Sequence, residues 1–306
     1  MATIKSAHPL MILLAVDGSD HAQAAVEILC DLPMSEGSSV TALSVLIPRE
    51  AGVKYAPMKS VLEHTKARMS EIGLEVTTEL MAGYPANVLN DFSCQRKPDL
   101  VVLGAKGLRA TLGILLGGVA QQVVEYACSP VMVVRAPYES LQKVLLVTDG
   151  SPHSQQAMEY LAKFPLPEEA KVELMHVMPP LLTPDLIARS WPIGVEVASP
   201  AMLSVDIEED LLRQAEAEEE DAKALLDRVQ RAAAALGLEV ETVLRRGDAA
   251  TEIIDYTKEA GVDLIVAGSR GLSQVTGWLL GSVSRKIIHY ASCSVLVVKS
   301  IEGAAS

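Results

Sequence analysis

The sequence predicts an α/β protein of two tandem domains, each a doubly wound, five-stranded parallel sheet with helices on both faces. Three observations support this prediction. The length of 306 residues suits about two domains. Short apolar runs alternate with helical patterns along each half, and the second half repeats the first. We place the boundary so that the domains are residues 1–138 and 139–306.

The repeat is visible in two blocks. The apolar stretch that ends in Asp17-Gly18-Ser19 returns, 132 residues later, as one that ends in Asp149-Gly150-Ser151. Residues 83–134 align without gaps to residues 247–298, at an offset of 164, with 19 identities in 52 positions. The change of offset gives the second copy 32 extra residues between its first and fourth strands. They fall mainly in an insertion at 181–221, whose first part, residues 181–202, suits a lid or a partner-binding loop.

Each copy reads as strands alternating with helices, beginning and ending on a strand. In the second copy the predicted strands are short and apolar on both faces, as strands covered on two sides must be: Lys143–Thr148, Lys171–Val177, Leu238–Leu244, Asp263–Ala267 and Val295–Lys299. The predicted helices between them are Ser154–Lys163, Ile207–Leu236, Ala250–Ala260 and Ser282–Tyr290.

The longest predicted helix carries one apolar stripe and one acidic stretch. Leu225, Val229, Ala232 and Leu236 recur at helical spacing, which predicts a buried stripe. The stretch Asp206–Asp221 holds nine acids and one base. We interpret these acids as a solvated face rather than a metal cage.

Composition and charge exclude several classes of protein. With 39 acidic and 26 basic residues the net charge is −13, which repels nucleic acid. We interpret the four cysteines, which form no CxxC pair, as reduced thiols of a cytoplasmic protein. The apolar run Pro9–Val16 is short and ends at Asp17, so we expect a strand and not a signal peptide. No apolar run approaches 18 residues, so no membrane span is expected.

Ligands of such sheets bind beyond the carboxyl ends of the strands, where the strand order reverses. Two loops of the second copy belong there: one after the first strand, with Asp149, and one after the fourth, residues 268–284. Asp149 suits hydrogen bonds from a ribose or adenine, or a metal-bound water.

The second loop suits a polyphosphate. Gly268 and Gly271 remove side chains where a ligand approaches the backbone. Gly281-Ser282 opens the last helix, whose free amides attract anions, and Arg270 adds a positive charge. The alternative is that the glycines only make turns and Ser282 only caps a helix.

The spacing of these residues resembles the ATP-binding signature of the universal stress protein family, G-x2-G-x9-G-[ST]. Gly268, Gly271, Gly281 and Ser282 match it completely. The resemblance covers nearly the whole chain as two domains. It implies a Rossmann-like fold similar to that of the adenine nucleotide alpha hydrolases, and a cytoplasmic regulatory role in the stress response.

The resemblance also implies the site. The site would hold ATP, or ADP or AMP. Mg would be bound through the phosphates, and no side chain is assigned as a metal ligand. In the second domain, the primary site, the nucleotide-binding residues would be Thr148, Asp149, Val177, Gly268, Arg270, Gly271, Gly281, Ser282, Val283 and Ser284. The weaker site of the first domain would use Val16, Asp17, Gly104, Lys106, Gly107, Gly117 and Gly118.

The first copy departs from the signature at one position. Gly118 stands where Ser or Thr is expected, so a hydroxyl donor is lost while the backbone amide remains. We therefore expect weaker binding there.

Other polar residues suggest no catalytic centre. We expect His176 to be a satisfied core histidine, and His21 and His153 to lie at the surface. Trp278, inside the glycine loop, is either an exposed contact or a cap on the loop. No Ser/His/Asp or Cys/His arrangement is legible, so enzymatic activity beyond weak ATP hydrolysis is not expected. A slow ATPase and a nucleotide-free scaffold, acting through its sheet edges and the insertion at 181–221, remain the alternatives.

The last strands of the two copies predict how the domains join. Val131–Val134 and Val295–Val298 are too apolar to be left as open edges. We expect them to pair antiparallel within one chain, which makes a pseudo-dimer of domains. A homodimer of whole chains, or an unidentified protein partner, would then use another surface. The competing arrangement is a swap between chains.

Overall fold

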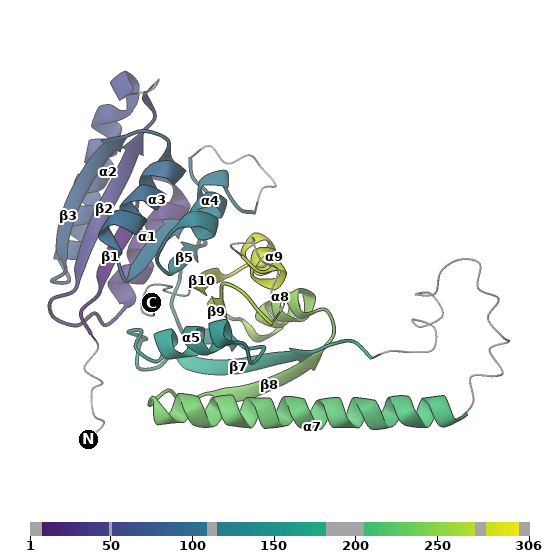
Figure 1. The fold of residues 1–306 in the computed structure, drawn as a ribbon. Coiled ribbons are helices and arrows are strands. Elements are labelled where there is room, and N and C mark those ends of the chain that lie inside the picture. The colour runs from purple at the N-terminus through teal and green to yellow at the C-terminus, as the bar shows by residue number, and fades with distance from the viewer. Residues whose placement is uncertain (1–7, 49–50, 109–114, 182–204, 273–279, 300–306) are drawn as a thin grey trace, which may run out of the picture.

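The computed structural model describes residues 8–48, 51–108, 115–181, 205–272 and 280–299 (Figure 1). Trp278, predicted to be a contact or a cap on the loop, and residues 182–204 of the insertion lie outside these ranges.

Helices and strands alternate through each half, as predicted. The elements of the first half are β1 (Met11–Ala15), α1 (Asp20–Asp31), β2 (Ser39–Leu46), α2 (Ala51–Ser70), β3 (Glu75–Ala82), α3 (Pro85–Arg96), β4 (Leu100–Gly104), α4 (Gly118–Tyr126) and β5 (Val131–Val134). Those of the second half are β6 (Lys143–Val147), α5 (Pro152–Leu161), β7 (Lys171–Met178), α7 (Val205–Ala235), β8 (Glu241–Arg246), α8 (Ala249–Ala260), β9 (Leu264–Gly268), α9 (Ser282–Tyr290) and β10 (Ser294–Val298).

One sheet of ten strands runs through both halves, in the order β3-β2-β1-β4-β5-β10-β9-β6-β7-β8. Every pair is parallel except β5 with β10, which lie side by side at the centre (Figure 1). Val133 faces Val295 and Met132 faces Leu296 across this junction. The predicted antiparallel pairing within one chain is therefore confirmed.

Each face of the sheet is covered by one apolar layer that both halves share. Side chains of α1, α2, α5 and α7 pack on one face, with Met132 and Leu296 in the same layer. Side chains of α3, α4, α8 and α9 pack on the other face, with Val133 and Val295. The junction strands are fully buried on both sides, which explains why every residue in them except Ser294 is apolar. No helix of the described residues is long and apolar enough to span a membrane.

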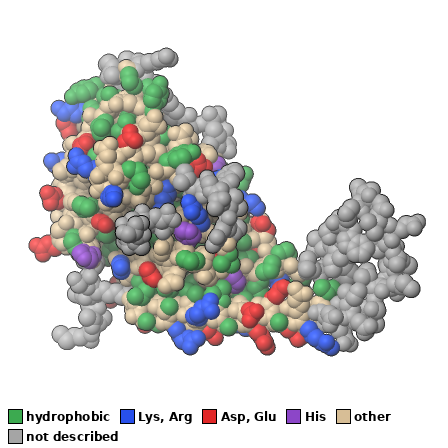
Figure 2. All heavy atoms as spheres, viewed as in Figure 1, with side chains coloured by type: hydrophobic (Ala, Val, Ile, Leu, Met, Phe, Trp, Pro, Cys, Tyr) green, Lys and Arg blue, Asp and Glu red, His purple; other side chains and the backbone are tan. Residues whose placement is uncertain are grey.

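The buried stripe of α7 differs from the predicted one. Ala222, Leu226 and Ala233 are buried against the sheet, whereas Ala232 and Leu236 are exposed. Val229 packs against the core as predicted and Leu225 is half-buried, but the rest of the stripe is shifted by one residue, because alanine is frequent on both sides of this helix and marks neither face. Charged side chains line the lower edge of the molecule, over α7 (Figure 2).

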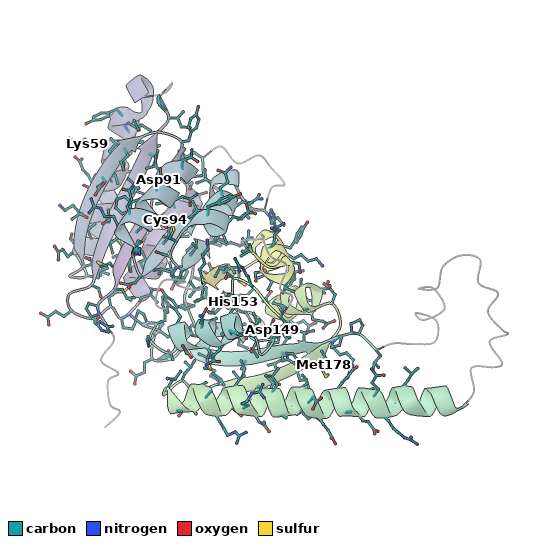
Figure 3. The ribbon with its side chains drawn as sticks, in the orientation of Figure 1. Lys59, Asp91, Cys94, Asp149, His153 and Met178 are labelled. Carbon is teal, nitrogen blue, oxygen red and sulfur yellow. A yellow bond between two sulfur atoms is a disulfide. The ribbon has the colours of Figure 1, made fainter. Side chains whose placement is uncertain are left out.

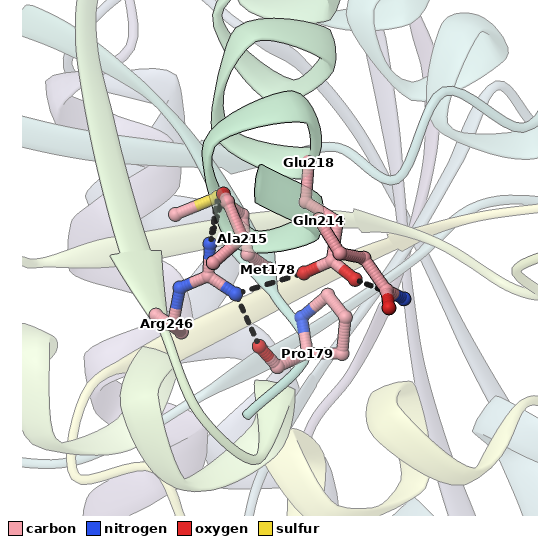
Figure 4. A network of polar contacts seen from close by, with 6 residues as sticks. All are labelled: Met178, Pro179, Gln214, Ala215, Glu218 and Arg246. Carbon is pink, nitrogen blue, oxygen red and sulfur yellow. Dashed lines mark hydrogen bonds and ion pairs between the residues drawn. The ribbon is translucent and has the colours of Figure 1, made fainter. Parts of the chain in front are cut away.

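Arg246, at the end of β8, fastens α7 to the carboxyl end of the sheet (Figure 4). Its guanidinium pairs with Glu218 at 2.9 Å and donates to the carbonyl oxygens of Ala215 and Pro179. Glu218, one acid of the stretch predicted to be solvated, thus binds α7 to the end of β8. No group of three or more potential metal-ligating side chains occurs in the described part of the chain.

The cysteine prediction was wrong for two of the four. Cys94, in the last turn of α3, is bonded to Cys128, just after α4. The Cys128 amide also donates to the buried Ser93 hydroxyl at 2.7 Å. The bond closes a sequence separation of 34 residues, which spacing alone does not reveal. Cys30 and Cys293 are free thiols whose pKa values are raised by burial.

Reduction of this disulfide should destabilise the protein. A crosslink across 34 residues restricts the unfolded chain and is worth about 4 kcal/mol. Urea unfolding with and without a dithiol reductant should show a loss of that order. Cys94→Ser should lower stability by a similar amount and remove the response to reductant; an unchanged midpoint on reduction would contradict the bond.

The β5–β10 junction makes a second prediction. Val133→Asp places a carboxylate in a strand pair where Val133 is 1 % exposed, so stability should fall by at least about 3 kcal/mol. Because the pairing lies within one chain, light scattering should give an unchanged oligomer mass. Clean conversion of a dimer to a monomer would support the swapped arrangement instead.

Candidate functional site

The loops after β1 and β4 meet at the carboxyl edge of the first half, where the strand order reverses. Asp17 joins them. Its Oδ1 accepts the Ser19 amide at 3.0 Å, and its Oδ2 accepts the Leu108 amide of the second loop at 3.1 Å. The carboxylate therefore ties the glycine loop to the first helix.

The second half repeats this arrangement. Asp149 (labelled in Figure 3) accepts the Ser151 amide on Oδ1 and the Leu272 amide on Oδ2, both at 3.0 Å. These bonds give the aspartate a structural role in addition to the ligand roles that the sequence suggested.

Two glycines of the signature are explained by the protein's own packing. A β-carbon at Gly268 would lie 2.6 Å from the His153 carbonyl oxygen, at the start of α5. One at Gly271 would lie 2.5 Å from Asp149 Oδ2. Gly104 and Gly107 meet the equivalent atoms in the first half. The space that these glycines leave is thus filled by α1 or α5 and by the aspartate, rather than left open for a ligand.

The third glycine sets up a helix N-terminus. The Gly281 amide donates to the Ser269 carbonyl oxygen at 2.8 Å, and the Gly117 amide to that of Ala105 at 2.7 Å. Beyond these bonds α9 and α4 begin, and the first amides of each helix have no acceptor within the helix. The buried Ser284 hydroxyl donates to the Gly268 carbonyl oxygen, whereas Ser282 is exposed at the helix start.

A cavity of about 370 Å³ opens at this edge of the first half. All seven residues predicted for the first domain line it: Val16, Asp17, Gly104, Lys106, Gly107, Gly117 and Gly118. Lys106 is the only cation among the described residues that line it, and Asp17 the only carboxylate.

Most of the cavity wall is apolar and was not predicted. It is supplied by β2, α2, α3, β4 and the residues before α4: Leu43, Val45, Leu46, Ile47, Met58, Leu89, Leu103 and Leu116. Val45 stands 132 residues before Val177, which was predicted as a site residue of the second domain. The repeat offset could therefore have predicted Val45 as well. Met58 and Leu89 carried no such signal, because they reach the cavity only through packing of their helices.

A family model described as the universal stress protein family matches residues 11–135 and again 140–299. The chain belongs to this family.

Known universal stress proteins resemble the chain over one or both halves. One from Mycolicibacterium smegmatis is 27% identical over 97% of this chain and 99% of its own length. Universal stress protein YxiE of Bacillus subtilis is 30% identical over 51% of this chain and 98% of its own. A crystal structure of a universal stress protein from Archaeoglobus fulgidus covers 95% of this chain and 96% of its own, with 20% identity and a TM-score of 0.64. That likeness shows the fold.

In the second half of this universal stress protein, the predicted residues gather at the same kind of edge. Thr148, at the end of β6, is buried, and its hydroxyl contacts that of Ser154. Val177 and Arg270 are half-buried. The rest of the loop, residues 273–279, lies outside the described ranges.

The histidines are placed differently from one another. His176 Nδ1 lies 2.8 Å from the Thr148 carbonyl oxygen, so its ring is partnered as expected. His21 and His153 are half-buried, not at the surface, because each opens a helix that packs under the glycine loop. His21 Nδ1 accepts the Ala136 amide at 2.8 Å. Burial, with a smaller contribution from Lys106, lowers the pKa of His21.

The structural role of Asp149 is testable without nucleotide. Asp149→Ala leaves the Ser151 and Leu272 amides without their acceptor, so the free energy of unfolding should fall by about 1–3 kcal/mol in nucleotide-free urea titrations. Asp17→Ala is the matched variant in the first half and should behave alike. Unchanged stability in both variants would show that the aspartates do not hold the loops.

Proposed function

We propose that this universal stress protein binds an adenine nucleotide, ATP or its products ADP and AMP, at the carboxyl edge of each half. Nucleotide occupancy would make it a regulatory module of the stress response in the cytoplasm. Other members of the family support the ligand class: one solved universal stress protein is in complex with cAMP, and one from Arabidopsis thaliana has AMP bound.

The observation that carries the proposal is the cavity of the first half. Its apolar wall suits an adenine ring and the carbon face of a ribose. At Gly117 and Gly118 the wall reaches the start of α4, where unpaired amides and the nearby Lys106 favour a phosphate. Apolar and anion-binding groups thus line one cavity, as a nucleotide requires.

The second half is proposed to bind more tightly. Asp149 accepts the same two loop amides as Asp17 does in the first half, and Gly268 and Gly271 make the same close contacts as Gly104 and Gly107. The second half adds the exposed Ser282 hydroxyl at the start of α9. The first half has Gly118 at that place, with open space around it. One lost neutral donor corresponds to about 0.5–1.5 kcal/mol, enough to rank the two sites.

Mg would be held through the phosphates. Both oxygens of Asp17 accept backbone amides, and no cluster of three or more potential ligands occurs among the described residues. Asp17 is the one carboxylate among the described residues that line the cavity, and it is already engaged by these amides; hydrolysis is not part of the proposal.

Matched glycine variants test the ranking. In Gly281→Val a β-carbon would lie 3.4 Å from Arg270 Cα, and the γ-methyls would crowd the proposed phosphate position. Calorimetry with Mg-ATP should show an affinity at least about tenfold lower, or 1.4 kcal/mol. Gly117→Val, whose β-carbon would lie 3.3 Å from the Ala105 carbonyl oxygen, should reduce total binding less. Greater harm from Gly117→Val would reverse the ranking.

A further inference from the structure

At the β5–β10 junction each half extends one cationic side chain to the other half. Arg135 follows β5 and Lys299 follows β10, at the repeat offset of 164 residues. Arg135 donates to the carbonyl oxygens of Ile288 at 2.7 Å and His289 at 3.5 Å, at the C-terminal end of α9. Lys299 donates to those of Glu125 at 3.1 Å and Ala127 at 2.6 Å, at the end of α4. Each half thus caps the last helix of the other.

The antiparallel pairing explains why each cation reaches the last helix of the opposite half. It points the carboxyl ends of β5 and β10 in opposite directions, so the end of each strand meets the amino edge of the other half. The last helix of a half runs back against its strands and ends at that amino edge. A cation there faces the negative end of a helix dipole.

Arg135 is a buried cation without a carboxylate partner among the described residues. It is 7 % exposed, and burial lowers the pKa of its guanidinium. Carbonyl oxygens therefore stabilise its positive charge, through charge-assisted hydrogen bonds that are stronger than neutral ones. Its backbone amide also donates to Ser294 Oγ at 3.2 Å, which fixes its place beside β10.

Arg135 makes one further contact, within its own half. A second arm of the Arg135 guanidinium donates to the Leu115 carbonyl oxygen at 2.6 Å. Leu116, the next residue, lines the cavity, and Gly117 follows with its amide bonded to Ala105. Arg135 therefore holds the end of the glycine loop of the first half while it is itself held by α9 of the second half. Within the described ranges Lys299 binds the end of α4, and Leu279, the repeat counterpart of Leu115, lies outside those ranges.

We propose that Arg135 is a positioning residue for the first nucleotide site. By fixing Leu115 it sets where Gly117 and the first amides of α4 lie relative to the cavity, and by binding the α9 carbonyls it makes that geometry depend on the second half. The nucleotide part of this proposal rests on the proposed function. A planar, forked guanidinium reaches both sets of carbonyls, whereas an ammonium is a point donor.

Hydrogen exchange of single amides in the nucleotide-free full chain tests the positioning. The Gly117 amide, bonded to Ala105, reports on the loop end, and the Gly281 amide, bonded to Ser269, is the internal reference in the other half. Arg135→Met and Arg135→Lys should both raise the exchange rate of Gly117 about tenfold relative to Gly281. Lys299→Met is the matched control, because it removes a helix-capping cation whose bonds among the described residues are to the end of α4 and not to Leu115, so the Gly117 exchange rate should stay unchanged. An unchanged ratio in the Arg135 variants, or an equal rise in Lys299→Met, would overturn the proposal.

Mg-ATP titration of the same variants in a Gly281→Val background separates the two claims. We expect affinity at the first site to fall about tenfold in both Arg135 variants and to stay unchanged in Lys299→Met. If Gly117 exchanges faster but ATP binds neither the variants nor their Gly281→Val parent, the positioning stands and nucleotide binding at the first site fails. If the parent binds ATP and the Arg135 variants bind it equally well, the inferred role of Arg135 in the site is wrong.

Discussion

The antiparallel contact between β5 and β10 governs the remaining architecture. It joins two parallel sheets into one, buries the two closing strands, and lets each apolar layer run through both halves. It also turns the two carboxyl edges away from each other. The two candidate nucleotide sites therefore lie at opposite edges of the sheet, and the end of each closing strand carries a cation to the last helix of the other half.

The glycine signature combines structural and ligand-binding demands. The first two glycines permit close packing against the first helix and the aspartate, and the third lets a helix begin beside the loop. The part that we propose to face a ligand is smaller: the free amides of α4 and α9, one lysine or arginine, and in the second half a serine hydroxyl. A glycine spacing alone would thus identify the loop geometry, and the cavity beside Lys106 supplies the argument for a ligand.

Much of this structure could be predicted from the repeat. Alternation of strands and helices, the parallel sheet and the pairing of β5 with β10 follow from apolar patterns that occur twice. The failures share a cause, which is that they depend on helix packing. Cys94 and Cys128 meet because α3 and α4 end side by side. The α7 stripe is shifted in phase, and Met58 reaches the cavity, through helix orientations that spacing does not encode. The contact between the second arm of Arg135 and Leu115 likewise depends on packing that the repeat does not encode.

Native mass spectrometry of the gently purified full chain, before and after addition of Mg-ATP, tests the central claim most directly. The account predicts an adenine nucleotide in the purified protein or, after titration, added masses of first one and then two nucleotides per chain. A chain that gains no nucleotide mass at millimolar Mg-ATP, or whose cavity keeps a different molecule that ATP does not displace, would contradict it.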